Sequence, residues 1–217
     1  MPDRPFERNR PLYRLGWHLC STFLDTAFRL ESYDADQVPR SGPFLLAANH
    51  ASYLDPPAVG VCFPRPIHYF ARESLFRGPA DPILRGVNAV PVSRSGSDLT
   101  AIRRALDVLG AGEGLLVFPE GTRSPDGNFL EPLRGIGLLA CKGRVPVVPA
   151  RLFHTHRAFG RGRAPAWGTR IKVRFGPPVP PADFDPANAE KNRFDEAAER
   201  IMDAIRAIPE PASAPEV

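Results

Sequence analysis

The sequence predicts a single α/β domain with a mostly parallel central sheet that is flanked by helices. Short apolar runs, such as residues 44–48 and 115–118, are typical of buried strands, and stretches with helical periodicity separate them. Strands that alternate with helices at this spacing favour a parallel sheet covered on both faces, with functional loops at the carboxyl ends of the strands. The chain has 217 residues, of which 43% are hydrophobic, and this is enough for one sizeable core.

Residues 1–30 form the first expected unit, an amphipathic helical segment that precedes the domain and lies in a membrane interface. Tyr13, Trp17 and flanking arginines favour contact with the interface, and the alternative is a helix packed on its own domain. The apolar residues of this helix, expected at 11–30, recur every three or four positions: Leu12, Leu15, Leu19, Phe23, Leu24, Ala27 and Leu30.

Residues 31–209 form the expected main domain, and the Pro- and Ala-rich tail at 210–217 is expected to be disordered. The two prolines in the strand at 145–150 predict that this strand lies at an edge of the sheet or contains bulges. The other expected strands are at 44–48, 67–71, 89–92, 115–118 and 171–175. One further helix is expected to begin near residue 72, and three more are expected at about 99–110, 136–141 and 188–208.

Local signals mark where two of these helices begin. Asp55 is a good N-cap, and Pro56 and Pro57 suit a first helical turn, where a missing N–H costs little. Ser97 is expected to cap the helix that follows it, and Gly110 to end that helix.

Charge and cysteine content narrow the class of protein. The net charge is +4, and by count 25 of the 28 basic residues are arginine, whose guanidinium suits anionic partners. Cys20, Cys62 and Cys141 are far apart and odd in number, which indicates a reducing compartment rather than a disulfide framework or zinc site. No secretory signal is evident, and no apolar run has the length of a membrane span.

The positive charge is concentrated in one part of the chain. Between Glu131 and Asp183 there is no acidic residue, whereas ten residues in that stretch are arginine or lysine. The segment 154–170 is therefore expected to be a basic loop close to an anionic partner. The alternative is a solvated loop whose charge only aids solubility.

The first chemical motif is the stretch of residues 49–56, at the carboxyl end of the strand 44–48. If Asp55 accepts the Nδ1 proton of His50, the imidazole is held in the tautomer whose Nε2 takes a proton from a substrate hydroxyl. Such a pair is a base with an orienting acid, with the nucleophile supplied by the substrate. The alternative is that Asp55 only caps a helix and His50 only forms a hydrogen bond in a loop.

The second motif follows the strand 115–118 and reads Phe-Pro-Glu-Gly-Thr-Arg-Ser at residues 118–124. Arg123 could clamp a phosphate with two parallel hydrogen bonds, while Glu120 orients that phosphate or receives a substrate hydroxyl. The alternative is that Glu120 and Arg123 only pair with each other across an exposed turn, where an ion pair contributes little.

Taken together, the motifs resemble those of the 1-acylglycerol-3-phosphate acyltransferases, the lysophosphatidate acyltransferase family. The family's NHxxxxD motif matches residues 49–55 and its FPEGTRS motif matches residues 118–124. An arginine-bearing motif resembles residues 90–94, and a Val-Pro-rich motif resembles residues 145–149, so the resemblance covers about residues 12–208. The chain departs from the family pattern in Ser93 before the arginine, in Arg72, and in Leu133-Arg134-Gly135 where Phe-Lys-x-Gly is usual.

The resemblance implies roles for individual residues. His50, oriented by Asp55, would deprotonate a glycerol hydroxyl that attacks the thioester of acyl-CoA or acyl-carrier protein. The acceptor's phosphate would bind at Arg94, Glu120, Gly121, Thr122 and Arg123. Supporting positions would be Asn49 and Arg72, with Val147 and Pro149 lining the acyl or oxyanion side.

The resemblance also implies the substrates, which are a lysophospholipid acceptor and an acyl-CoA or acyl-carrier-protein donor. The amphipathic segment at 11–30 and the absence of a span predict peripheral or monotopic attachment to a membrane surface with anionic lipid, at the cytoplasmic face. No cofactor is expected apart from the donor substrate, and no metal, because no His, Cys or carboxylate cluster has ligand spacing.

Two alternatives to lysophosphatidate acylation remain open. One is the same chemistry on another lyso-lipid or on an amino-acid lipid. The other is a non-catalytic module that binds anionic lipid. Nucleic-acid binding is disfavoured, because the basic tract lacks interleaved stacking aromatics and any known nucleic-acid module.

Overall fold

The computed structural model describes residues 10–62, 65–79, 81–92, 99–186 and 192–212. Its centre is a seven-stranded sheet in the order β1-β7-β6-β2-β5-β3-β4, in which every neighbouring pair is parallel except β6 and β7. The strands are β1 (Glu31–Tyr33), β2 (Phe44–Ala48), β3 (Ile67–Arg72), β4 (Ala89–Val92), β5 (Gly114–Val117), β6 (Val147–Phe153) and β7 (Lys172–Phe175). The predicted α/β domain with a mostly parallel sheet is confirmed.

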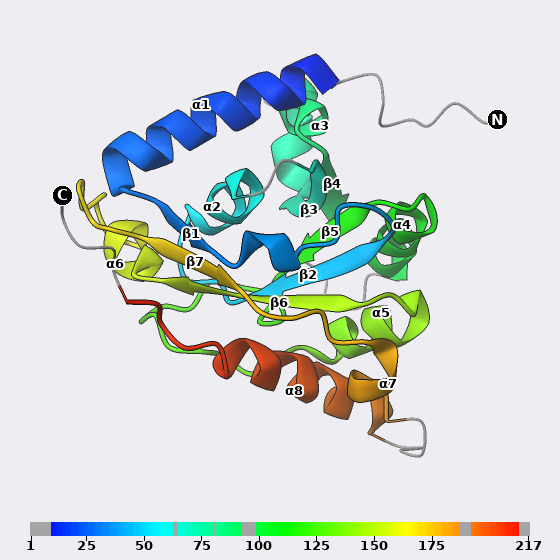
Figure 1. Cartoon of the computed structure of the whole chain (residues 1–217). Coiled ribbons are helices and arrows are strands. Elements are labelled where there is room, and N and C mark those ends of the chain that lie inside the picture. Colours follow the sequence, from blue (N-terminus) through cyan, green and yellow to red (C-terminus); the bar gives the residue numbers. More distant parts are fainter. Residues whose placement is uncertain (1–9, 63–64, 80, 93–98, 187–191, 213–217) are drawn as a thin grey trace.

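Helices cover both faces of this sheet, as Figure 1 shows, with α1 and α2 above it and α5, α7 and α8 below. The helices are α1 (Arg10–Phe28), α2 (Asp55–Val61), α3 (Asp81–Gly86), α4 (Leu99–Gly110), α5 (Arg134–Gly143), α6 (Thr155–Phe159), α7 (Pro181–Phe184) and α8 (Arg193–Arg206), with short 3-10 turns at Ala35–Gln37 and Glu73–Arg77. Ser97, the expected cap of α4, lies outside the described residues.

The central strand β2 shows why the sheet needs both layers. All five of its residues are buried. Phe44, Leu46 and Ala48 pack into the core shared with α1 and α2, whereas Leu45 and Ala47 pack into the core shared with α4, α5 and α8. Because successive side chains of a strand point to opposite faces, an uninterrupted apolar run satisfies two cores at once.

The strand β6 corrects the expectation that its prolines place it at an edge, because it lies inside the sheet between β7 and β2. Pro146 precedes the strand, and only Pro149 lies within it. On the β7 side, the regular ladder ends at the pair Ala150 and Phe175, and the Gly176 N–H still donates to the Pro149 carbonyl at 2.8 Å. Val147 then forms an isolated bridge with Val179, so residues 176–178 lie opposite residues 148 and 149. Three residues opposite two form a bulge, the alternative that the prolines also predicted, and Pro149, which has no N–H to donate, lies within it.

Helix α1 has two apolar faces, and the inner one packs on the domain that follows it, as the alternative to a membrane-interface helix expected. Leu24 and Phe28 are 1% exposed in the core above the sheet, and the Tyr13 hydroxyl accepts a hydrogen bond from the Ile67 backbone N–H. An apolar cavity of about 100 Å³ lies between α1 and α2. The outer face presents four large side chains to solvent: Leu12, Leu15, Leu19 and Phe23. No helix among the described residues is long and apolar enough to cross a membrane.

The start of the tail, expected to be disordered, contacts the sheet as far as the structure describes it. The Lys172 Nζ, on a side chain that is only 5% exposed, donates to the Glu210 carboxylate at 2.8 Å and to the Pro211 carbonyl at 2.9 Å. The carbonyl of Ala212 accepts from the Tyr33 hydroxyl at 3.3 Å. A buried ammonium group needs such partners, and here residues 210–212 supply them.

Candidate active site

The candidate site forms where the carboxyl ends of three neighbouring strands meet. β2 lies between β5 and β6, so the turn after β2, the loop after β5 and helix α6 after β6 come together at one end of the sheet (Figure 1). The turn after β2 carries His50, and the loop after β5 carries Glu120 and Arg123. Parallel pairing thus unites two motifs that are about 70 residues apart in the chain.

His50 and Asp55 lie within hydrogen-bond distance, with His50 Nδ1 2.9 Å from Asp55 Oδ2. The same carboxylate oxygen accepts the backbone N–H groups of Ala51 at 2.6 Å and Ser52 at 2.7 Å. An ionised carboxylate has no proton to give, so we assign the Nδ1 proton to the imidazole. The nitrogen left to accept a proton is then Nε2.

Asp55 differs from the expected N-cap, since the cap of α2 is Leu54 and Asp55 is the first helical residue. Its carboxylate folds back onto the turn before the helix, where three N–H groups converge on one oxygen. The expectation for Pro56 and Pro57 holds, because both lie in the first turn of α2. A fully buried carboxylate needs several donors, and the tight turn between His50 and Asp55 provides them.

The imidazole of His50 is further held by an aromatic contact. Its ring stacks on Phe118 with the centroids 4.0 Å apart and the planes 16° from parallel. The His50 side chain retains 16% exposure, so the ring is fixed on one face and through Nδ1 while solvent reaches part of it. A fixed imidazole with an accessible edge suits proton transfer.

Glu120 braces the histidine turn from the neighbouring loop. One of its carboxylate oxygens accepts the His50 backbone N–H at 2.8 Å, and the other accepts the Leu130 N–H at 3.0 Å. Burial raises the pKa of Glu120, and these two N–H donors partly offset that rise. Each oxygen already has a partner within the protein, so this geometry gives Glu120 a bracing role instead of the expected contact with phosphate.

The loop around Glu120 is shaped by Gly121, which has a φ of 65°. A Cβ at this position would also come within 2.2 Å of the Leu133 side chain. After this turn the Ser124 N–H donates to the His50 carbonyl at 2.8 Å, which joins the two motifs directly. Thr122, between the turn and Arg123, is exposed.

Arg123 lies next to the histidine turn without pairing to Glu120. Its guanidinium carbon is 3.5 Å from the centroid of the Tyr53 ring. Its Nη1 is buried and has no hydrogen-bond partner among the residues that the structure describes. A half-buried cation with an unpaired donor is suited to bind an anion close to the histidine turn.

Of the other residues predicted for the site, one contacts a neighbouring strand by its side chain, three lie in strands, and one lies outside the described residues. Asn49 joins β2 to β6, because its side chain exchanges two hydrogen bonds with the backbone of Leu152. Arg72 ends β3, and Arg94 lies outside the described residues. Val147 and Pro149 are buried in β6. Neither can donate to an oxyanion, because the Val147 N–H is bonded to Val179 and proline has none.

Two residues of the site have no signal of their own in the sequence. The Ser52 hydroxyl donates to the Phe159 carbonyl at 2.7 Å and accepts the Leu54 N–H at 3.1 Å. Phe159, at the end of α6, also packs its ring 5.1 Å from that of Tyr53. The contacts of Ser52 and Tyr53 with Phe159 span about a hundred positions in the chain, so local spacing cannot reveal them.

Fold and site together have the arrangement of an enzyme: a histidine held by a buried aspartate, which suits the activation of a hydroxyl group, lies near an arginine whose Nη1 is unpaired among the described residues. The comparisons with known proteins identify the family. The model of the family described as Acyltransferase matches residues 29–152, more than half of the chain. The chain therefore belongs to the acyltransferase family.

Individual relatives agree with this assignment. The 1-acyl-sn-glycerol-3-phosphate acyltransferase of Bacillus subtilis is 27% identical over 175 residues, which cover 80% of this chain and 85% of that protein. The human 1-acyl-sn-glycerol-3-phosphate acyltransferase alpha is 30% identical over 162 residues, covering 73% of this chain and 57% of the relative, so this chain matches little more than half of the human protein.

A solved structure supports the fold. The crystal structure of the 1-acyl-sn-glycerophosphate (LPA) acyltransferase PlsC from Thermotoga maritima superposes with a TM-score of 0.71. It has 24% sequence identity, and the match covers 93% of this chain and 81% of that one.

Proposed function

We propose that this enzyme transfers a fatty acyl group from acyl-CoA or acyl-carrier protein to the 2-hydroxyl of 1-acylglycerol 3-phosphate, which gives phosphatidate. The observation that carries the proposal is the hydrogen bond of 2.9 Å between His50 Nδ1 and the buried Asp55 carboxylate. The printed names of the relatives, in Bacillus subtilis and in human, support the choice of acceptor.

The proposed reaction begins with proton transfer at His50. Its Nε2 takes the proton of the acceptor hydroxyl while Asp55 stabilises the imidazolium that forms. The hydroxyl oxygen bonds to the thioester carbonyl carbon, and the carbon–sulfur bond then breaks. The departing thiolate takes the proton from Nε2, so the histidine is regenerated and no cofactor or metal takes part.

The acceptor's phosphate is proposed to bind Arg123, with Arg94 as a second cation. The supporting observation is that Nη1 of Arg123 has no hydrogen-bond partner among the described residues. A guanidinium can donate two parallel hydrogen bonds to one phosphate, which would orient the glycerol beside His50. Gly121 and Thr122 would contribute the exposed backbone of that pocket.

The decisive experiment is the release of free thiol from palmitoyl-CoA, with and without oleoyl-lysophosphatidate. We expect release that depends on the acceptor, and a loss of at least about 10²-fold in His50→Ala. His18→Ala, at an exposed histidine of α1, is the matched control and should retain full activity. An active His50→Ala enzyme would refute the base assignment.

Further arms of the same experiment test donor and acceptor. Palmitoyl-carrier protein in place of palmitoyl-CoA identifies the donor. Monoacylglycerol, which lacks the phosphate, tests the anion site. Equal turnover of monoacylglycerol and lysophosphatidate would contradict the role proposed for Arg123.

We also propose that the enzyme works peripherally at the cytoplasmic face of a membrane that contains anionic lipid. Support comes from the exposed outer face of α1 and from Trp167, which is 65% exposed and stacks on Phe28 with the ring centroids 5.4 Å apart. Arg161 and Arg163 are exposed in the same segment as Trp167. Tryptophan and arginine beside an apolar helix face suit an interface with anionic headgroups.

A further inference from the structure

Arg123 differs from the other arginines that lie over an aromatic ring without a carboxylate partner. Arg65 and Arg151 donate to backbone carbonyl groups, whereas Arg123 has no hydrogen-bond acceptor among the described residues. Several other arginines are held by carboxylates, as in the pairs Arg174 with Asp34 and Arg193 with Asp185. Arg123 forms no salt bridge within the described part of the chain. It is held instead by the ring of Tyr53, 3.5 Å from the guanidinium carbon to the ring centroid.

The contact with the Tyr53 ring leaves the N–H donors of the Arg123 guanidinium unoccupied. A guanidinium stacked on a ring meets it with its face, whereas all its N–H donors point outward in its own plane. A carboxylate partner would occupy two of those donors and neutralise the charge. The ring therefore supplies an orienting contact that does not compete with an anionic ligand.

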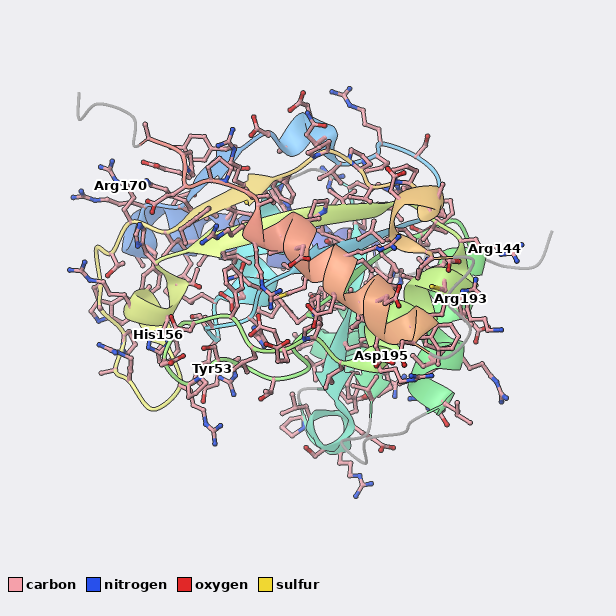
Figure 2. The ribbon with its side chains drawn as sticks, turned by 90° about the horizontal axis from the view of Figure 1, so that it is seen from below. Tyr53, Arg144, His156, Arg170, Arg193 and Asp195 are labelled. Atoms are coloured by element: carbon pink, nitrogen blue, oxygen red, sulfur yellow. The ribbon has the colours of Figure 1, made fainter. Side chains whose placement is uncertain are left out.

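Tyr53 is itself well anchored, although its side chain is 50% exposed. Its backbone N–H donates to the Phe159 carbonyl at 3.3 Å, and its ring packs against the Phe159 ring. The neighbouring Ser52 forms a bridge with Gly160. Figure 2 shows Tyr53 at the end of the molecule that also carries His156 of α6, away from Arg144 and Arg193.

Tyr53 also links the cation to the catalytic turn. It lies in the turn between His50 and Asp55, while Arg123 precedes Ser124, whose N–H binds the His50 carbonyl. The stacked pair is thus a second contact, besides that of Ser124 with His50, between the histidine turn and the loop that follows β5. A shift of the Tyr53 ring would move the guanidinium relative to the imidazole.

We propose that Tyr53 is a positioning residue for Arg123, which holds the guanidinium in the orientation that receives the acceptor's phosphate. The inference rests on the proposed function and extends it to a residue outside both the histidine–aspartate pair and the Glu-Gly-Thr-Arg segment. The contribution of Tyr53 comes from its aromatic face, so its hydroxyl is dispensable.

The test compares Tyr53→Leu and Tyr53→Phe with the wild-type enzyme in the thiol-release assay, over a range of lysophosphatidate concentrations. We expect Tyr53→Leu to raise the KM for lysophosphatidate about 3- to 10-fold with kcat changed by less than about 2-fold, because binding of the phosphate is weakened before and in the transition state alike. Tyr53→Phe should restore the KM to within about 2-fold of wild type.

A double-mutant cycle separates positioning from a general effect on the turn. In an Arg123→Ala background, Tyr53→Leu should raise the KM by less than about 1.5-fold, because the group that it positions is gone. A KM of Tyr53→Leu equal to that of wild type would overturn the proposal. So would a Tyr53→Phe variant as impaired as Tyr53→Leu, or a full effect of Tyr53→Leu without Arg123.

The wild-type measurement distinguishes failure of the proposed function from failure of the role proposed for Tyr53. Absence of lysophosphatidate turnover by the wild-type enzyme with either donor would refute the proposed function. Robust wild-type turnover with an unchanged KM in Tyr53→Leu would refute only the role of Tyr53.

Discussion

At the scale of single residues, the site depends on carboxylates whose partners are mostly backbone N–H groups. Asp55 binds the N–H groups of Ala51 and Ser52 besides the imidazole, and Glu120 binds those of His50 and Leu130. Backbone donors are held by the fold itself, so they orient a carboxylate more rigidly than a flexible side chain would. The geometry of the base is therefore built into the turn.

Glu120→Gln tests this bracing. The amide has one oxygen, so its NH₂ group must face one of the two backbone N–H donors and leave it unsatisfied. We expect a loss of about 1–3 kcal/mol in the free energy of unfolding, measured by urea denaturation. Glu131→Gln, at an exposed position of the same loop, should change stability by less than about 0.5 kcal/mol. Equal stability of Glu120→Gln and wild type would show that the carboxylate does not brace the turn.

At the scale of elements, α1 serves the core and faces solvent at the same time. Its inner face carries Leu24 and Phe28, and Trp167 extends its outer face by an edge contact with the exposed Phe23, with the ring centroids 6.2 Å apart. Deleting the segment would expose the core beneath it, so a deletion cannot separate membrane binding from folding. Point substitutions on the outer face can separate the two, because they leave the core unchanged.

Leu19→Ser is the appropriate variant, because Leu19 is 63% exposed at the middle of the outer face. Sedimentation with vesicles that contain phosphatidylserine should show a partition coefficient about tenfold lower, since burial of one leucine in the interface is lost. Leu99→Ser on α4, where Leu99 is 73% exposed, is the matched control and should sediment like wild type. If both variants partition alike, the outer face of α1 is not the membrane contact.

At the scale of the whole molecule, the sheet buries a titratable group far from the proposed chemistry. His68 on β3 is 1% exposed. Burial lowers the pKa of His68 from 6.5 to about 4, and a hydrogen bond with the Gly114 backbone opposes this shift in part. The unfolded chain therefore binds a proton at His68 between pH 6.5 and about 4, whereas the folded protein does not.

It follows that His68 contributes stability in full above pH 6.5, and that this contribution is lost as the pH falls toward about 4. The loss should reach about 3 kcal/mol. Urea denaturation between pH 7 and pH 4.5 should show a weaker pH dependence for His68→Gln, which cannot titrate. The same slope in both proteins would contradict this assignment.

Much of the fold could be predicted from the sequence because its signals are local. Apolar runs identified β2, β3, β4 and β5, and periodicity identified α1 and α4, since burial on one or two faces imposes those patterns. For β6, two prolines in one run predicted an edge strand or bulges, and the edge alternative was wrong. Only the tertiary structure shows that the irregular pairing with residues 176–179 accommodates Pro149 inside the sheet.

The chain by itself determined the chemistry-bearing motifs, namely the His50 to Asp55 turn and the Glu-Gly-Thr-Arg segment, and from them the family. Spacing along the chain carries this information because both motifs are short and contiguous. Only the tertiary structure decided that Glu120 braces His50, that Asp55 is the first residue of α2, and that Tyr53 stacks on Arg123. The contacts of Glu120 with His50 and of Arg123 with Tyr53 join segments about 70 residues apart, and their partners are set by the pairing of β2 with β5, which no local pattern encodes.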